Sequence, residues 1–165
     1  LHTAYRRQRQ MCIRDRLTYG HLDIIKRLNS MYDEVIVAIL INEAKQSLFT
    51  LNEREEILRH ELKENNLNNV TIKSFEGLLV NFAKEENCKV IARGLRLIAD
   101  YEYEKNIARI NASLYEGLET IFLLANSNYS FISSSGVKEV ASFKGDISPF
   151  VSINVEKEIR KKYNY

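Results

Sequence analysis

Val35-Ile36-Val37-Ala38-Ile39-Leu40-Ile41 is an unbroken run of apolar residues, most of them β-branched. A run of this kind is typical of a parallel strand that is buried on both faces of a sheet. Apolar residues at helical spacing precede it over residues 20–31. The capping-box pattern Thr50-Leu51-Asn52-Glu53 comes after it and begins a helix that ends near Asn66. This order of helix, strand and helix predicts an α/β protein.

The same alternation continues to the C-terminus. Further strands are predicted at 70–75, 89–92 and 119–124, and further helices at 76–87, 98–115, 134–143 and 155–162. Strands that alternate with helices form right-handed βαβ units. We therefore expect a Rossmann-like, doubly wound open parallel sheet with helices on both faces, which binds ligands outside the carboxyl ends of its strands.

The composition is that of one ordinary domain. The chain has 165 residues, and its net charge of +2 comes from residues 1–16, since the remainder holds 19 basic and 21 acidic residues. This distribution argues against nucleic-acid binding. No apolar run is long enough to span a bilayer, no secretory signal is visible, and Cys12 and Cys88 form neither a metal-ligand spacing nor a disulfide framework. We expect a cytoplasmic protein that binds neither nucleic acid nor membrane.

Residues 1–16 differ from the rest of the chain. They hold five arginines, show neither helical nor strand periodicity and do not begin with methionine. They could be a basic arm that touches nucleic acid or lipid. We favour the interpretation that they are translated vector or adapter sequence with irregular structure, so that the domain proper is residues 17–165.

Thr18-Tyr19-Gly20-His21 places a histidine in the first turn of the helix predicted over residues 20–31. The free N–H groups and the dipole at a helix start attract phosphate. An imidazole there can stabilise charge on a phosphate that is being transferred. Taken alone, Gly20 could equally be a turn residue and His21 an ordinary polar residue.

Other polar residues lie on the same predicted rim of the sheet. Arg93-Gly94-Leu95-Arg96 offers two guanidinium groups around a glycine, and guanidinium suits phosphate oxygens. Ser133-Ser134-Ser135 opens a helix and can form an anion site, although one serine would suffice for capping. Lys45 comes after the central strand, and Glu104 could accept hydrogen bonds from a ribose or be an ordinary surface carboxylate. A site with many cations and no nucleophile fits transfer between phosphates.

Four motifs make the chain from Leu17 onward resemble the bacterial phosphopantetheine adenylyltransferases of the nucleotidyltransferase superfamily. They are Thr18–His21, Arg93–Arg96, Asp100–Glu104, and Tyr129–Ser135 with Val137-Lys138-Glu139. The resemblance implies that ATP and 4′-phosphopantetheine become dephospho-coenzyme A and pyrophosphate, with Mg²⁺, by in-line attack and without a covalent enzyme intermediate. It also implies a cytoplasmic homohexamer.

The resemblance further assigns roles to individual residues. His21 matches the histidine that stabilises the transition state. The phosphopantetheine-binding positions are Lys45, Leu79 and Arg93. The ATP-binding positions are His21, Gly94, Leu95, Arg96, Glu104, Tyr129, Ser130, Phe131, Ile132, Ser133, Ser134 and Ser135. No residue of the chain is assigned as a metal ligand.

The chain departs from the family at two places. Gly136 stands where the family usually has a larger apolar residue. The family begins with a central strand and a Gly-Ser/Thr-Phe-Asp-Pro turn, and residues 1–16 match neither. We therefore expect that the first strand and its turn are missing or replaced, and that this chain folds and turns over poorly. Two alternatives stay open: another nucleotidyltransferase of this fold with a different phosphorylated acceptor, or a non-catalytic protein that binds nucleotide or nucleic acid.

Overall fold

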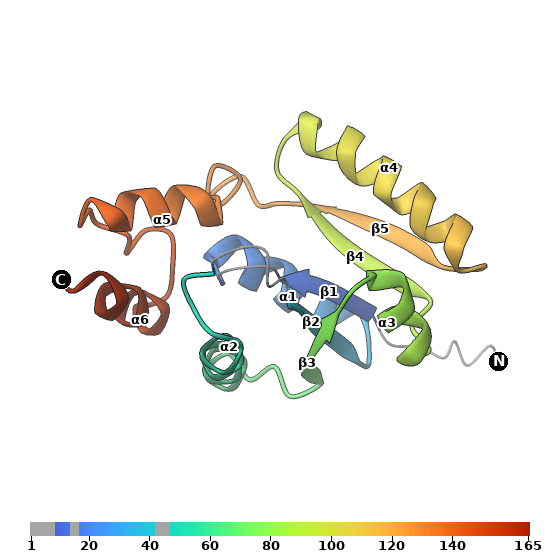
Figure 1. Ribbon diagram of the computed structural model, residues 1–165, viewed down its shortest axis with the longest axis horizontal. Coiled ribbons are helices and arrows are strands. Elements are labelled where there is room, and N and C mark those ends of the chain that lie inside the picture. Colours follow the sequence, from blue (N-terminus) through green and yellow to red (C-terminus); the bar gives the residue numbers. More distant parts are fainter. Residues whose placement is uncertain (1–8, 14–16, 42–46) are drawn as a thin grey trace.

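The computed structural model describes residues 9–13, 17–41 and 47–165 (Figure 1). Within them, one sheet is built from β1 (Arg9–Ile13), β2 (Val35–Ile41), β3 (Val70–Glu76), β4 (Val90–Leu95) and β5 (Glu119–Leu124). The helices are α1 (Tyr19–Met31), α2 (Leu51–Glu64), α3 (Leu79–Glu85), α4 (Ile98–Leu114), α5 (Ser134–Ser142) and α6 (Ile153–Tyr163). The predicted alternation of strands and helices is confirmed.

The sheet is parallel throughout, in the order β3-β2-β1-β4-β5, and β1 lies at its centre. Met11 pairs with Val37 of β2 on one side and with Ala92 of β4 on the other. The first strand of the family was expected to be missing or replaced, and residues 9–13 form a strand in its place, so the expectation of irregular structure is wrong for these residues. The physical reason is that β2 and β4 each present a row of N–H and C=O groups that need partners, and the backbone of any extended segment can satisfy both rows. The segments 1–8 and 14–16, which include the position expected for the glycine-rich turn, lie outside the described residues.

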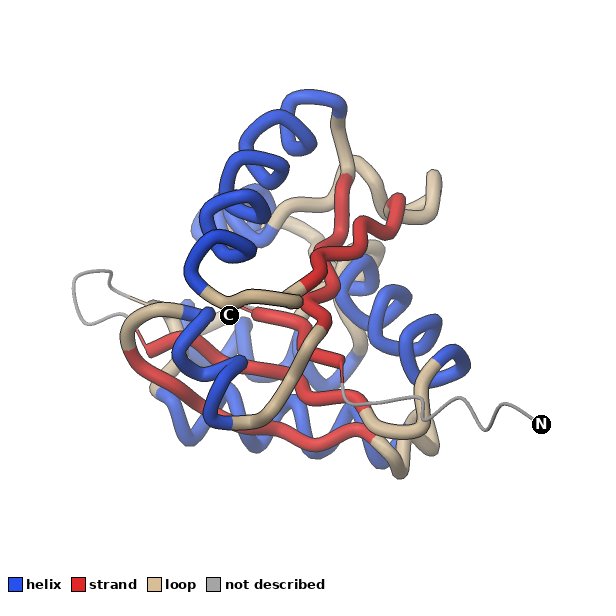
Figure 2. The backbone as a smooth tube through the Cα atoms, turned by 90° about the vertical axis from the view of Figure 1, so that its right-hand side faces the viewer, coloured by secondary structure: helices blue, strands red, loops and turns tan. Residues whose placement is uncertain are grey.

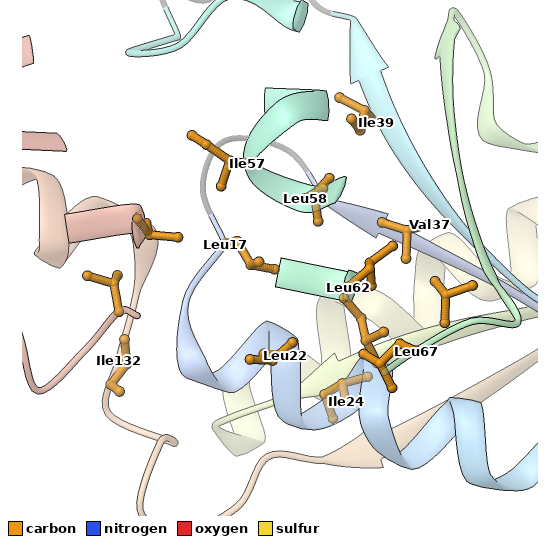
Figure 3. Close-up of a cluster of buried hydrophobic side chains, with 14 of the residues drawn as sticks. Leu17, Leu22, Ile24, Val37, Ile39, Ile57, Leu58, Leu62, Leu67 and Ile132 are labelled. Carbon is orange, nitrogen blue, oxygen red and sulfur yellow. The ribbon is translucent and has the colours of Figure 1, made fainter. Parts of the chain in front are cut away.

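β2 is the strand around which the core forms, and helices cover both faces of the sheet, as predicted (Figure 2). Successive residues of a strand point to opposite faces. Val37 and Ile39 belong to the hydrophobic cluster on the face covered by α1 and α2, which Figure 3 shows with Leu22, Ile24, Leu58 and Leu62. Ile36 and Ala38 pack on the other face, against Phe82 of α3. All four residues from Val35 to Ala38 have 0% exposed surface, which fits the prediction of a strand buried on both faces.

Two element boundaries near the ligand-binding rim differ from the prediction. β4 runs to Leu95 instead of ending before Arg93, because β5 supplies partners for three more residues, from Arg93 with Phe122 to Leu95 with Leu124. α3 begins at Leu79 instead of residue 76, because β3 continues to Glu76 and Gly77 then turns the chain with a φ of +86°. Arg93 and Gly94 therefore belong to a strand and are not in a loop.

α4 differs from the other helices in that none of its residues is buried. It lies alongside β4 and β5 (Figure 1), and its Tyr101 ring meets Phe122 of β5 edge-on, with 5.8 Å between ring centroids. Of the helices in the described part of the chain, none has the length and apolar character required to cross a bilayer.

Candidate active site

The start of α1 is held by hydrogen bonds that its first backbone N–H groups donate. Thr18 is the N-cap in an extended conformation, and the N–H of Tyr19 donates to the carbonyl of Phe150 (3.1 Å). The N–H of Thr18 donates to Nδ1 of His21 (3.2 Å), and Thr18 Oγ1 lies 2.9 Å from the same ring nitrogen. Because a backbone N–H can only donate, Nδ1 of His21 is an acceptor without a proton. The proton of the neutral ring is therefore on Nε2.

The electrostatics of the site keep this ring neutral. Burial, followed by the positive charges of Arg96 and Arg93, lowers the pKa of His21 from 6.5 to about 4. At neutral pH, His21 therefore offers an uncharged Nε2–H donor. α1 and β4 also pack together here, since a Cβ added at Gly94 would lie 3.5 Å from Cγ1 of Ile24.

Arg93 is paired within the protein. Its Nε donates to Oε2 of Glu104 (2.8 Å) and its Nη2 donates to Oε1 (2.6 Å), so the contact is bidentate and joins β4 to α4. Charge-assisted pairs of this geometry are among the stronger polar contacts in proteins.

Arg96 connects two segments of the rim. Its Nη1 donates to the carbonyl of Ile132 (3.3 Å), and its Nε lies 3.6 Å from Oδ2 of Asp100. The same Asp100 oxygen accepts from the backbone N–H groups of Arg96 (3.1 Å) and Leu97 (3.2 Å). The segment after β4 is thereby fixed to the segment before α5.

The serine-rich segment caps α5. Ser133 Oγ accepts from the N–H of Gly136 (2.9 Å) and lies 3.2 Å from Ser135 Oγ. A Cβ added at Gly136 would come within 3.0 Å of Ser133 Oγ. Glycine at this position therefore gives the cap room, which is a structural reason for the departure from the family at Gly136.

The segment 129–135 also meets α1. The rings of Tyr19 and Tyr129 have centroids 5.8 Å apart, and a Cβ added at Gly20 would lie 3.6 Å from Tyr129 Cβ. Ile132 is buried in the same hydrophobic cluster as Leu22 (Figure 3), whereas Phe131 is 70% exposed. Ser130 donates to the carbonyl of Ser127 (3.1 Å).

Two residues that were predicted for the site remain, Leu79 and Lys45. Leu79 is half-buried at the start of α3, where it packs against the small clusters on that face. Leu78, the N-cap of α3, is 59% exposed. Lys45 lies outside the described residues.

Sequence reasoning gave no role to Thr18, Asp100 or Phe150. A carboxylate in the first turn of a predicted helix, as at Asp100, is a recognisable capping signal. No sequence pattern could have indicated Phe150, because its carbonyl accepts a hydrogen bond from the N–H of Tyr19, which is far away in the sequence.

The site can bind anions through one imidazole N–H, two guanidinium groups and the start of α5. Within the residues that the structure describes, no three His, Cys, Asp or Glu side chains form a group that could hold a metal ion. Donors of these kinds can position phosphate groups and stabilise their charge.

Comparison with known proteins agrees with this fold and identifies the family. The structure is similar to the lipopolysaccharide core biosynthesis protein from Thermoplasma volcanium GSS1, with a TM-score of 0.50, 18% identity and coverage of 72% of this chain and 95% of that one, which supports the fold. The model of the cytidylyltransferase-like family matches residues 15–140. The phosphopantetheine adenylyltransferase of Shouchella clausii (strain KSM-K16) is 48% identical over 149 residues, which cover 90% of this chain and 92% of that protein. The chain therefore belongs to the cytidylyltransferase-like family and, within it, to the phosphopantetheine adenylyltransferases, as the sequence motifs predicted.

Proposed function

We propose that this chain transfers the adenylyl group of ATP to 4′-phosphopantetheine, giving dephospho-coenzyme A and pyrophosphate in coenzyme A biosynthesis. The observation that carries the proposal is the imidazole of His21, which Thr18 holds at the start of α1 and whose pKa is lowered by burial and by the charges of Arg96 and Arg93. It occurs in a chain that is 48% identical to a phosphopantetheine adenylyltransferase. The strand order β3-β2-β1-β4-β5 supports the Rossmann-like, doubly wound type of sheet on which such transfers occur.

In this reaction an oxygen of the acceptor phosphate attacks the α-phosphorus of ATP in line. The bond from the α-phosphorus to the oxygen that bridges to the β-phosphate breaks, and pyrophosphate leaves with the electron pair. His21 donates from Nε2 to a non-bridging oxygen of the α-phosphate, where its hydrogen bond stabilises the transition state. No bond forms between substrate and enzyme.

The other residues bind and orient the two substrates. For ATP we propose Arg96 and the start of α5 at Ser133, Ser134 and Ser135 as phosphate contacts. The segment Tyr129–Ile132 and the backbone of Gly94 and Leu95 would hold the nucleoside. For 4′-phosphopantetheine we propose Lys45, Leu79 and Arg93, with the arginine and the lysine on the phosphate.

Mg²⁺ would enter with ATP. The described residues form no metal group, and the carboxylates of Glu104 and Asp100 contact arginines and backbone N–H groups. Mg²⁺ binds substrate phosphates and retains several waters, so it needs few protein ligands. The part of the chain that the structure describes therefore builds no site of its own for Mg²⁺.

We also propose a homo-oligomer, a homohexamer by family resemblance, in the cytoplasm. Tyr103, Ile110 and Leu114 recur at helical spacing along α4 and are 64%, 53% and 48% exposed. Leu124, at the end of edge strand β5, is 73% exposed. Exposed apolar side chains that recur along one helix are typical of protein interfaces, so Tyr103→Asp or Ile110→Asp should dissociate the assembly in sedimentation velocity.

The decisive experiment measures pyrophosphate release from ATP with 4′-phosphopantetheine and identifies dephospho-coenzyme A by mass. CTP in place of ATP, and 4′-phosphopantothenate in place of the acceptor, serve as controls for the two substrate sites. Faster turnover with either control would favour another nucleotidyltransferase, and binding of ATP without turnover of any acceptor would favour a non-catalytic protein.

A second comparison tests whether residues 1–16 impair the enzyme. In the matched variant, the family's first strand and Gly-Thr-Phe-Asp-Pro turn replace those residues. We expect the variant to turn over faster and to melt at a higher temperature. Equal turnover by the two chains would contradict the expected impairment, and no turnover by either would contradict the proposed function.

A further inference from the structure

The aromatic rings of Tyr19 and Tyr129 bring the start of α1 into contact with the segment 129–135. Their centroids are 5.8 Å apart and their planes are inclined by 31°, a spacing at which aromatic pairs attract each other. The two backbones also approach closely, since a Cβ added at Gly20 would lie 3.6 Å from Cβ and 3.7 Å from the carbonyl oxygen of Tyr129. The ring of Tyr19 has no role in the proposed reaction.

We propose that Tyr19 is a positioning residue that fixes the ring of Tyr129 at the nucleoside end of the ATP site. This inference rests on the proposed function, in which the segment Tyr129–Ile132 holds the nucleoside. Tyr19 lies in the same first turn of α1 as His21. One helical turn therefore carries both the side chain that fixes the nucleoside end of ATP and the imidazole that meets its α-phosphate.

The backbone of Tyr129 is already restrained by turns. Its N–H donates to the carbonyl of Asn126 (2.8 Å), and its carbonyl accepts from the N–H of Ile132 (3.0 Å). The freedom that remains is rotation of the side chain, which packs against the hydrophobic cluster on the face covered by α1 and α2 and meets the ring of Tyr19. The ring contact restricts this rotation before ATP arrives, so less side-chain entropy is lost on binding.

Tyr19 is itself held at its backbone. Its N–H donates to the carbonyl of Phe150 (3.1 Å). A substitution of the side chain keeps this N–H and leaves the contact of Thr18 with His21 in place. Burial, followed by the negative charge of Glu61, raises the pKa of the Tyr19 hydroxyl, so Tyr19 is a neutral ring at neutral pH.

The test compares Tyr19→Leu and Tyr19→Phe with the wild-type chain by calorimetric titration of each substrate alone. Leucine removes the ring but keeps an apolar side chain that suits a helix, whereas phenylalanine keeps the ring. We expect the Kd for ATP to rise about three- to tenfold in Tyr19→Leu, as for the loss of one aromatic pair, and less than about twofold in Tyr19→Phe. The Kd for 4′-phosphopantetheine should stay unchanged in both.

Tyr32→Leu is the matched control. Tyr32 is half-buried like Tyr19 and lies at the opposite end of the same helix, as the C-cap of α1. The substitution removes a ring that packs against the hydrophobic cluster. It should lower the melting temperature without changing the Kd for ATP.

A fluorescent reporter tests the positioning without any substrate. The chain contains no tryptophan, so Tyr129→Trp places a single indole at the contact. In this background we expect Tyr19→Leu to lower the anisotropy of the emission, because the indole turns more freely, and Tyr32→Leu to leave it unchanged. In a Tyr129→Leu background, Tyr19→Leu should weaken ATP binding far less than in the wild-type chain, because the ring that it positions is gone.

An unchanged Kd for ATP in Tyr19→Leu would overturn the proposal, even if the reporter at position 129 turns more freely. Loss of affinity for both substrates would show that the substitution disturbs the start of α1 in general, and would overturn it as well. Equal weakening by Tyr19→Phe and Tyr19→Leu would assign the effect to the hydroxyl and contradict the role of the ring. Selective loss of ATP affinity with lower anisotropy supports the proposal even if the wild-type chain binds ATP without turnover of any acceptor, a result that would count against the proposed reaction alone.

Discussion

Replacing His21 tests whether the imidazole acts as a neutral hydrogen-bond donor. The ring is fixed by Thr18, whose N–H donates to Nδ1 at 3.2 Å, so Nε2–H faces away from the cap. His21→Ala removes the donor, and His21→Gln replaces it with an amide N–H of similar reach. If the ring acts in the transition state, the substitutions should lower kcat far more than they raise KM for ATP.

The magnitude comes from the pKa of the ring. With a pKa of about 4, charging His21 at pH 7 in the empty site would cost about 4 kcal/mol, at about 1.4 kcal/mol per pH unit. The neutral form is therefore the one that meets ATP. One preorganised donor to a developing oxyanion contributes about 3–4 kcal/mol, so His21→Ala should lower kcat about 10²–10³-fold, and His21→Gln less.

The assay measures kcat/KM for ATP between pH 5.5 and 8.5 for the wild-type chain and for His21→Gln. Substrate phosphates titrate near pH 6, but they affect both enzymes equally and cancel in the ratio of the two. We expect this ratio to be independent of pH. A ratio that falls as the pH rises through about 6.5 would mean that a protonated imidazole is the active form, and the reasoning from burial and the two arginines would then be wrong.

Three further predictions concern stability. Because the pKa of His21 is near 6.5 unfolded and about 4 folded, the folded state binds fewer protons between these values. The contribution of His21 to the free energy of unfolding, about 3 kcal/mol, is therefore complete above pH 6.5 and is lost as the pH falls toward 4. The free energy of urea unfolding should therefore depend less on pH in this window for His21→Gln than for the wild-type chain. Ser152→Ala removes both the N-cap of α6 and the 2.6 Å hydrogen bond to buried Glu61. It should cost about 2–4 kcal/mol against about 0.5 kcal/mol or less for exposed Ser142→Ala, and equal losses would contradict the assigned contacts. Met11→Pro removes a backbone hydrogen-bond donor from the central strand and should abolish cooperative unfolding, whereas Met11→Val should not. An unchanged melting curve for the proline variant would contradict the pairing of β1 with β2 and β4.

Much of the fold was predictable because its signals are local. The apolar run Val35–Ile41 and the capping box at Thr50 each depend on neighbours within a few residues, and the structure has β2 and α2 there. The family motifs could also be recognised in the sequence, since each is a short contiguous segment next to a predicted strand or helix. The position of Arg93 near the rim could be predicted from the short apolar strand segment to which it is joined, although the strand itself runs on to Leu95.

The site contacts were not predictable in the same way. Glu104 could be named from its motif, but its bidentate partner depends on how α4 lies against β4. The length of β4 depended on partners in β5. The neutral state of His21 depends on burial and on two arginines more than seventy positions further along the chain.

The sequence by itself determined the α/β class, the order of its elements and the family, because hydrophobic periodicity, caps and motifs are properties of short segments. Only the tertiary structure decided that residues 9–13 complete the sheet, that Thr18 and Phe150 hold the start of α1, and that Glu104 faces Arg93. The physical reason is that backbone pairing and charge pairing join groups by distance in space, and the pattern of one segment carries no information about which distant segment will satisfy it.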